Sequence, residues 1–148
     1  MKALTIDPAT ADLGAMIERG TILHGHLGPF LVAGIRMGLL ALRELGSPGY
    51  FGLRVESWAG RTTPLSCLND GIQIGSGCTA GKGNLSIVGE DGPRARFVSD
   101  DGRAIEVELK REIMDSFRGS DTIAKAREVE ALPEEEPVSY THLTLPTN

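Results

Sequence analysis

The segment from Pro29 to Leu45 constrains the fold most, because it predicts one long helix whose two ends are both marked. Proline suits the first turn of a helix, and the glycine at position 46 is a typical C-terminal stop. Gly34 and Gly38 lie one turn apart, so we expect another backbone to approach this helix closely. The apolar positions repeat at helical spacing and form a stripe of Leu31, Ile35, Leu39 and Leu42.

The remaining segments predict an α+β fold, in which N-terminal helices pack on a mainly antiparallel sheet. A first helix is expected over residues 9–23, weakened or ended by Gly20, and a last one over 121–131. The helix that starts at Ser66 is expected to end early, at the glycines from Gly71 onward. Residues 51–59 alternate as a strand. Three further β-rich runs, separated by turn sequences, predict an antiparallel meander over 84–88, 94–98 and 103–109.

Composition narrows the classes of function. The chain has 148 residues, 41% of them hydrophobic and 24% charged, which suits one globular domain. Its net charge of −5 argues against a nucleic-acid partner and against an anionic membrane surface. No apolar run approaches the roughly 18 residues that a membrane span needs. With two cysteines and no signal-peptide pattern at the start, we expect a cytoplasmic protein with reduced thiols.

The C-terminal end differs from the rest of the chain. We expect a core domain over residues 1–132, followed over 133–148 by an acidic end and a non-native tail. The acidic run Glu134–Glu136 is expected to be solvated. The stretch from Val138 to Thr147 reads VSYTHLTLPT and matches one reading-frame translation of a transposase adaptor used to prepare sequencing libraries. We therefore expect the natural reading frame to be lost near Pro137, a native disordered tail being the alternative.

Outside that tail, all histidines and cysteines fall in two glycine-rich blocks. HGHLGP contains His24 and His26, and SCLNDGIQIGSGCTAGKGN contains Cys67 and Cys78. Two imidazoles and two thiolates are sufficient ligands for tetrahedral zinc or another late transition metal. Gly25 favours a loop, on which the two histidines can share one face. The alternative is that the cysteines are buried as small hydrophobes and the histidines cap a helix.

The second block also predicts polar groups around such a site. If the segment is helical, Asp70 and Gln73 share a face with Cys67. Asp70 is then expected to orient a histidine, with capping or surface exposure as the alternative. GSGCTAGKGN is neither a Walker loop nor a dinucleotide fingerprint, but its amides suit an anion. A tight turn with a solvated lysine is the other interpretation. The side chains expected to support the ligands or to contact an anion are Asp70, Thr79, Lys82 and Asn84.

Together, HGHLGPFLVAGIRMG and SCLNDGIQIGSGCTAGKGNL resemble the E-subunit family of formylmethanofuran dehydrogenase, from about His24 to the β-rich runs. The resemblance implies an α+β core, usually dimeric, with the His and Cys motifs around a metal site. Many members have a cysteine where this chain has Gly28, so a ligand or reactive thiol is missing here. Some members add a C-terminal zinc-binding module built on further cysteines, and this sequence shows none of those cysteines.

Three functions are consistent with these residues. The first is a metal-binding accessory protein, with zinc as the expected metal, similar to the subunit that associates with molybdenum- or tungsten-dependent formylmethanofuran dehydrogenase, within or outside methanogenesis. The second is a stand-alone metal enzyme, in which the metal activates water or polarises a carbonyl and Asp70 or Lys82 assists proton transfer. The third is a thiol switch between Cys67 and Cys78, which requires sulfur atoms within disulfide reach. We expect the accessory role, because no combination of residues in the sequence is typical of a particular enzymatic reaction.

Overall fold

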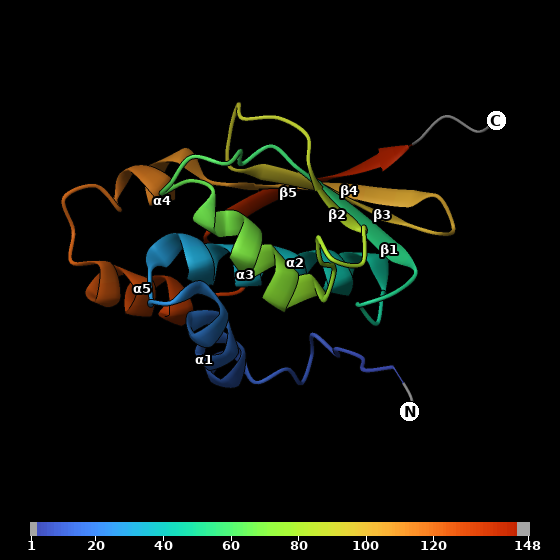
Figure 1. The fold of residues 1–148 in the computed structure, drawn as a ribbon, viewed down its shortest axis with the longest axis horizontal. Coiled ribbons are helices and arrows are strands. Elements are labelled where there is room, and N and C mark those ends of the chain that lie inside the picture. The colour runs from blue at the N-terminus through green and yellow to red at the C-terminus, as the bar shows by residue number, and fades with distance from the viewer. Residues whose placement is uncertain (1–2, 145–148) are drawn as a thin grey trace.

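In the computed structural model, which describes residues 3–144, five strands form one sheet in the order β2-β1-β3-β4-β5 (Figure 1). β1 pairs with β2 in parallel, and the three other neighbouring pairs are antiparallel. The mainly antiparallel sheet expected from the sequence is therefore confirmed. The strands are β1 (Leu53–Ser57), β2 (Leu85–Ile87), β3 (Arg94–Ser99), β4 (Arg103–Leu109) and β5 (Val138–Thr144).

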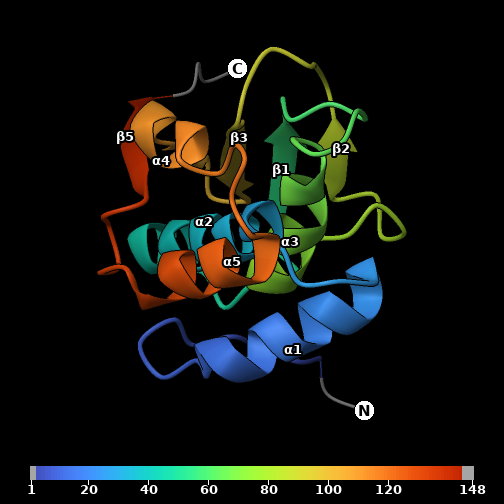
Figure 2. The same ribbon diagram turned by 90° about the vertical axis from the view of Figure 1, so that its left-hand side faces the viewer.

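The helical layer is centred on α2, which packs against β4 of the sheet and is flanked by α3 and α5. α1 packs on α2 and α3 and lies farther from the sheet (Figure 2). This is the expected arrangement of helices on a sheet, and the α+β class is confirmed. No helix within residues 3–144 is long and apolar enough to cross a bilayer. The helices are α1 (Leu13–His24), α2 (Pro29–Leu45), α3 (Cys67–Ser76), α4 (Arg111–Asp115) and α5 (Thr122–Ala131).

α2 begins and ends where the sequence predicts. Pro29 occupies its first turn, and Gly46 ends it in the left-handed region with φ of 61°. Three residues of the predicted stripe, Leu31, Ile35 and Leu42, are at most 1% exposed, and Leu39 packs at the edge of the core. Burial of this stripe against the sheet and α3 anchors the core.

The glycines of α2 and α3 let the two helices approach closely. A Cβ added at Gly38 would lie 2.7 Å from the carbonyl carbon of Gly75, and one added at Gly71 would lie 2.8 Å from the Cα of Gly34. The predicted close approach to α2 is confirmed, and α3 is the element that makes it. The predicted early end of α3 is wrong, because the helix continues through both of its glycines to Ser76. Packing against α2 outweighs the low helix propensity of glycine.

The prediction that Gly20 weakens or ends its helix is also wrong, because α1 continues through this residue to His24. Gly20 is buried, and a Cβ there would lie 3.3 Å from the Cδ1 atom of Ile35. Gly20 thus allows α1 to pass close to α2 rather than interrupting α1.

The predicted antiparallel meander is only partly correct. β3 and β4 form an antiparallel hairpin, but β2 lies on the far side of β1 and runs parallel to it. The chain reaches β2 from β1 through α3, and such a helical crossover returns the chain in the same direction. The unit β1–α3–β2 therefore places the second motif block along the helical face of the sheet.

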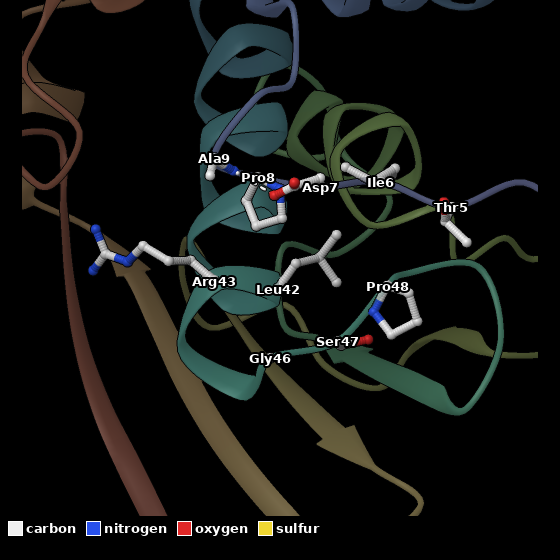
Figure 3. Close-up of a pocket in the computed structure, with 10 residues that line it drawn as sticks. All are labelled: Thr5, Ile6, Asp7, Pro8, Ala9, Leu42, Arg43, Gly46, Ser47 and Pro48. Atoms are coloured by element: carbon white, nitrogen blue, oxygen red, sulfur yellow. Dashed lines mark hydrogen bonds between the residues drawn. The ribbon is translucent and has the colours of Figure 1, made fainter.

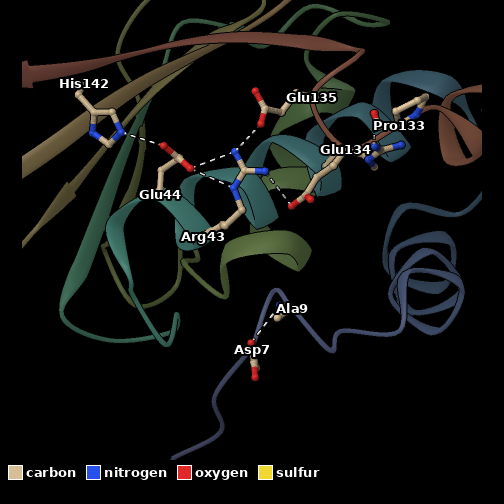
Figure 4. A network of polar contacts seen from close by, with 9 residues as sticks. Asp7, Ala9, Arg43, Glu44, Pro133, Glu134, Glu135 and His142 are labelled. Atoms are coloured by element: carbon tan, nitrogen blue, oxygen red, sulfur yellow. Dashed lines mark hydrogen bonds and ion pairs between the residues drawn. The ribbon is translucent and has the colours of Figure 1, made fainter.

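The C-terminal end contacts the helical layer (Figure 4). Arg36 is 7% exposed and donates hydrogen bonds to the carbonyl oxygens of Val129 at 2.7 Å and Pro133 at 2.8 Å. Glu134 and Glu135 are more than half exposed, as expected for a solvated end, and both pair with Arg43, at 3.2 and 3.1 Å.

The beginning of the expected tail forms a strand rather than a disordered segment. β5 pairs with β4 along its whole length, and Val138 is 2% exposed. An open sheet edge offers main-chain hydrogen bonds to any β-prone segment, so this pairing does not depend on the origin of the segment. Residues 145–147 of the expected tail lie outside the described part of the chain.

Candidate functional site

The HGH motif lies at the turn between α1 and α2. His24 is the last residue of α1 rather than part of a loop, and Gly25 follows it in the left-handed region with φ of 98°. This turn brings the chain back, so that the ring centroids of His24 and His26 are 4.8 Å apart and tilted by 49°. The expectation that both histidines share one side is met, with one of them on the helix end and one in the turn.

Asp70 joins this pair from α3. Its Oδ2 atom lies 2.6 Å from the Nδ1 atom of His24, whose side chain is only 12% exposed. A carboxylate on one ring nitrogen holds the imidazole in place and leaves the other nitrogen for a ligand. The predicted role of Asp70 in orienting a histidine therefore matches the geometry.

Cys67 is the first residue of α3, one helical turn before Asp70, and is partly buried with a free thiol. Burial raises the pKa of this thiol, and the Asp70 carboxylate raises it further. The thiol is therefore protonated at neutral pH, so a metal that binds it must displace the proton.

The fourth expected ligand, Cys78, lies at the opposite end of α3. It follows the helix C-cap Gly77, is fully buried, and its Sγ atom lies 3.7 Å from the carbonyl oxygen of Leu53. Burial raises the pKa of this thiol. α3 alone rises by about 14 Å from Cys67 to Ser76, roughly twice the 7 Å Cα–Cα limit of a disulfide, and Cys78 follows two residues after its end. In this structure the two free thiols lie at opposite ends of α3 and are not brought together, and the four-ligand set and the thiol switch stay predictions.

The three other predicted polar residues shape the loop after α3. The Lys82 ammonium donates to the carbonyl oxygen of Gly77 at 2.6 Å and lies 3.3 Å from the Thr79 hydroxyl. The Thr79 amide donates to the Asn84 side chain, which in turn donates to the carbonyl oxygen of Tyr50. These contacts stabilise the loop and the C-terminal end of α3. The tight turn is thus present, and anion contact by these residues stays a prediction.

Gln73 connects the two ends of α3, a role that residue types alone did not indicate. Its Nε2 atom donates to Oδ1 of Asp70 at 3.2 Å, and its Oε1 atom accepts from the Ala80 amide at 3.0 Å. The spacing of three residues from Asp70 was the available signal, because residues three apart on a helix are neighbours. The contact with Ala80 depends on how the loop folds back, which the sequence does not reveal.

The side chains that meet at the HGH motif suit a metal as donors, although they do not yet enclose one. Imidazole and thiolate are preferred zinc ligands, and both are present at one end of α3. Within residues 3–144, no three His, Cys, Asp or Glu side chains are already arranged as a metal-binding group. His24 and His26 would supply half of a tetrahedral ligand set, called the half-site below, and metal binding by this half-site stays a prediction.

A cavity near the start of the described chain lies away from this half-site. It has a volume of about 500 Å³ and lies between the N-terminal segment Thr5–Ala9 and the end of α2 (Figure 3). None of the eight residues predicted as ligands or supporting groups lines it. The site at the HGH motif is thus a surface cluster, open to solvent or to a partner.

The fold and the histidine pair define a class of protein. It is an α+β domain in which His24 and His26 lie between the end of α1 and the start of α2, next to the start of α3. The chain belongs to the FmdE family, since the family model described as "FmdE, Molybdenum formylmethanofuran dehydrogenase operon" matches residues 23–147. The resemblance inferred from the two motifs is confirmed.

Two individual proteins are also similar to this chain. A solved FmdE-like protein from Syntrophus aciditrophicus, described as similar to the E subunit of tungsten formylmethanofuran dehydrogenase, is 21% identical with a TM-score of 0.70. The alignment covers 97% of this chain and 78% of that protein, and at this identity it shows the shared fold. A probable S-adenosyl-L-methionine-binding protein of Archaeoglobus fulgidus is 34% identical over 74 residues. That match covers 49% of this chain and only 20% of the curated relative.

Proposed function

We propose that this protein is a metal-binding accessory protein similar to the E subunit of molybdenum or tungsten formylmethanofuran dehydrogenase, with zinc as its metal. The observation that supports this most is the pair of imidazoles 4.8 Å apart, one of them held by a carboxylate at 2.6 Å. A carboxylate behind a histidine is the usual support of a metal-ligating imidazole.

In this proposal the metal is held by His24, His26 and Cys67, with Asp70 supporting His24. Cys78 is not a ligand, because α3 separates it from the other three. When bound, a zinc ion with three protein ligands and one open position polarises a bound water or carbonyl. The chain itself orients His24 and presents the cluster at the surface, where a partner can complete the coordination.

We further propose that the protein acts in the cytoplasm as a homodimer and associates with a molybdenum- or tungsten-containing oxidoreductase, within or outside methanogenesis. The family description, which names the formylmethanofuran dehydrogenase operon, supports this association. The negative charge of the chain and its two free cysteines agree with a cytoplasmic protein.

Zinc binding tests the site. Purified protein should bind one zinc ion per chain, measured by elemental analysis and by competition with a chromogenic chelator. His24→Ala and His26→Ala should each weaken binding at least about tenfold, whereas Cys78→Ser, a matched cysteine variant, should bind as the parent does. Equal binding by all variants would dismiss the site.

Purification from the native source tests the role. We expect the protein to co-purify with a large pterin-containing molybdenum or tungsten oxidoreductase. Zinc-dependent turnover by the isolated protein, lost in His26→Ala, would instead favour the stand-alone metal enzyme considered from the sequence.

A further inference from the structure

A continuous series of polar contacts runs along one side of α3, from the loop that follows the helix to the HGH motif. The Ala80 amide contacts Oε1 of Gln73 at 3.0 Å, and Nε2 of Gln73 contacts Oδ1 of Asp70 at 3.2 Å. Oδ2 of Asp70 then contacts Nδ1 of His24 at 2.6 Å. Gln73 and Asp70 are half-buried, whereas the hydrogen bond between Ala80 and Gln73 is exposed.

The chemistry of these groups fixes the direction of every hydrogen bond in the series. A backbone N–H can only donate, so Ala80 orients the Gln73 amide with its oxygen toward the loop. The Gln73 nitrogen therefore faces Asp70 and donates to it. An ionised carboxylate can only accept, so its second oxygen accepts from His24, and the hydrogen must be on Nδ1. Nε2 of the neutral imidazole is then left with a lone pair.

We infer that Gln73 is a positioning residue. Anchored by the Ala80 amide, it holds the Asp70 carboxylate against Nδ1 of His24, and this contact selects the imidazole form that carries its hydrogen on Nδ1. The form of the imidazole follows from the contacts of the chain itself. Its consequence, that Nε2 of His24 is ready to bind zinc, rests on the proposed function. Through Gln73, the loop after α3 supports the histidine at the other end of that helix.

The imidazole form is measurable in the metal-free protein by long-range ¹H–¹⁵N NMR, which distinguishes Nδ1–H from Nε2–H. At about pH 8.5 we expect His24 in the Nδ1–H form, because Nδ1 faces the Asp70 carboxylate at 2.6 Å. Gln73→Glu keeps the acceptor for Ala80 but cannot donate to Asp70, and Gln73→Met removes both contacts at similar size. In both variants the Nδ1–H population should fall, and zinc affinity should fall about tenfold.

Gly81→Ala is the matched control, because it lies in the same loop and a Cβ there meets no atom within 4 Å. It should leave the imidazole form and the zinc affinity unchanged, and amide spectra verify that each variant is folded. An Nε2–H form in the parent protein would overturn the inference, as would a parent-like form in both Gln73 variants. If the parent binds no zinc, the proposed function fails, while the NMR result still decides the role of Gln73.

Discussion

Position 28 is a glycine in this chain, where the family resemblance implies a cysteine in many members, and the structure shows what a side chain there would meet. A Cβ added at Gly28 would lie 3.2 Å from Cε1 of His26, and the backbone there is extended, with φ of −148°. The side chain of His26 is exposed, so it can shift by the few tenths of an ångström required. A thiol at this position would therefore lie beside the His26 imidazole.

We predict that Gly28→Cys tightens zinc binding at least about tenfold, because it adds a thiolate ligand to the half-site. Competition with a chelator measures the change. Gly28→Ser is the matched control, since serine is similar in size and lacks the sulfur, and it should show no gain. An equal effect of serine and cysteine would contradict the prediction.

Cys78 makes a pH-dependent contribution to stability. Burial raises its pKa in the folded protein above that of the unfolded chain, so above about pH 8.5 the unfolded chain binds fewer protons than the folded one. The free energy of unfolding should therefore fall as the pH rises through this region. Cys78→Ala should lose less stability than the parent between about pH 8 and 10, measured by urea denaturation. Parallel losses in the two proteins would contradict this account.

At the scale of elements, the α2–α3 interface depends on glycines that no side chain can replace without movement of backbone. We predict that Gly38→Ala lowers the free energy of unfolding by about 2 kcal/mol or more, because its Cβ would lie 2.7 Å from the backbone of Gly75. Gly14→Ala is a matched control, in an exposed position of α1 where the nearest atom is 3.4 Å away. There alanine should stabilise by about 0.5–1 kcal/mol. Loss of stability in both variants would contradict a specific interface.

The same elements show what the sequence could predict. Both ends of α2 follow from local chemistry, since Pro29 and Gly46 act within one turn. The length of α3 does not, because local propensity ends it at Gly71 and only contact with α2 explains its continuation. The position of β2 likewise depends on pairing between distant segments.

The candidate site follows the same rule: its local contacts were predictable from the sequence, and its long-range arrangement was not. The half-site at His24 and His26, and its contact with Asp70, follow from a tight turn and from spacing along a helix. In the structure the full length of α3 lies between Cys67 and Cys78. Local helix propensity predicts a shorter helix here and therefore does not reveal this separation. The four residues were combined into one expected site because they share two glycine-rich blocks, and the sequence alone does not show how the fold arranges the two cysteines.

At the scale of the whole molecule, β5 completes the sheet, and we still propose that the natural reading frame is lost near Pro137. The edge of β4 pairs with β5 through main-chain groups, so the pairing is compatible with either origin. Amplification of the locus from source DNA should show codons that diverge from the adaptor translation after position 137. An uninterrupted natural frame through residue 147 would contradict the proposal.

At this scale we propose that the whole fold assembles a zinc site from the HGH turn and the start of α3, without Cys78. X-ray absorption at the zinc edge of the loaded protein tests this most directly. We predict imidazole nitrogens at about 2.0–2.1 Å and one sulfur at about 2.3 Å. The sulfur signal should disappear in Cys67→Ser and persist in Cys78→Ser. Sulfur ligation that survives in Cys67→Ser, or zinc without imidazole ligands, would contradict the account.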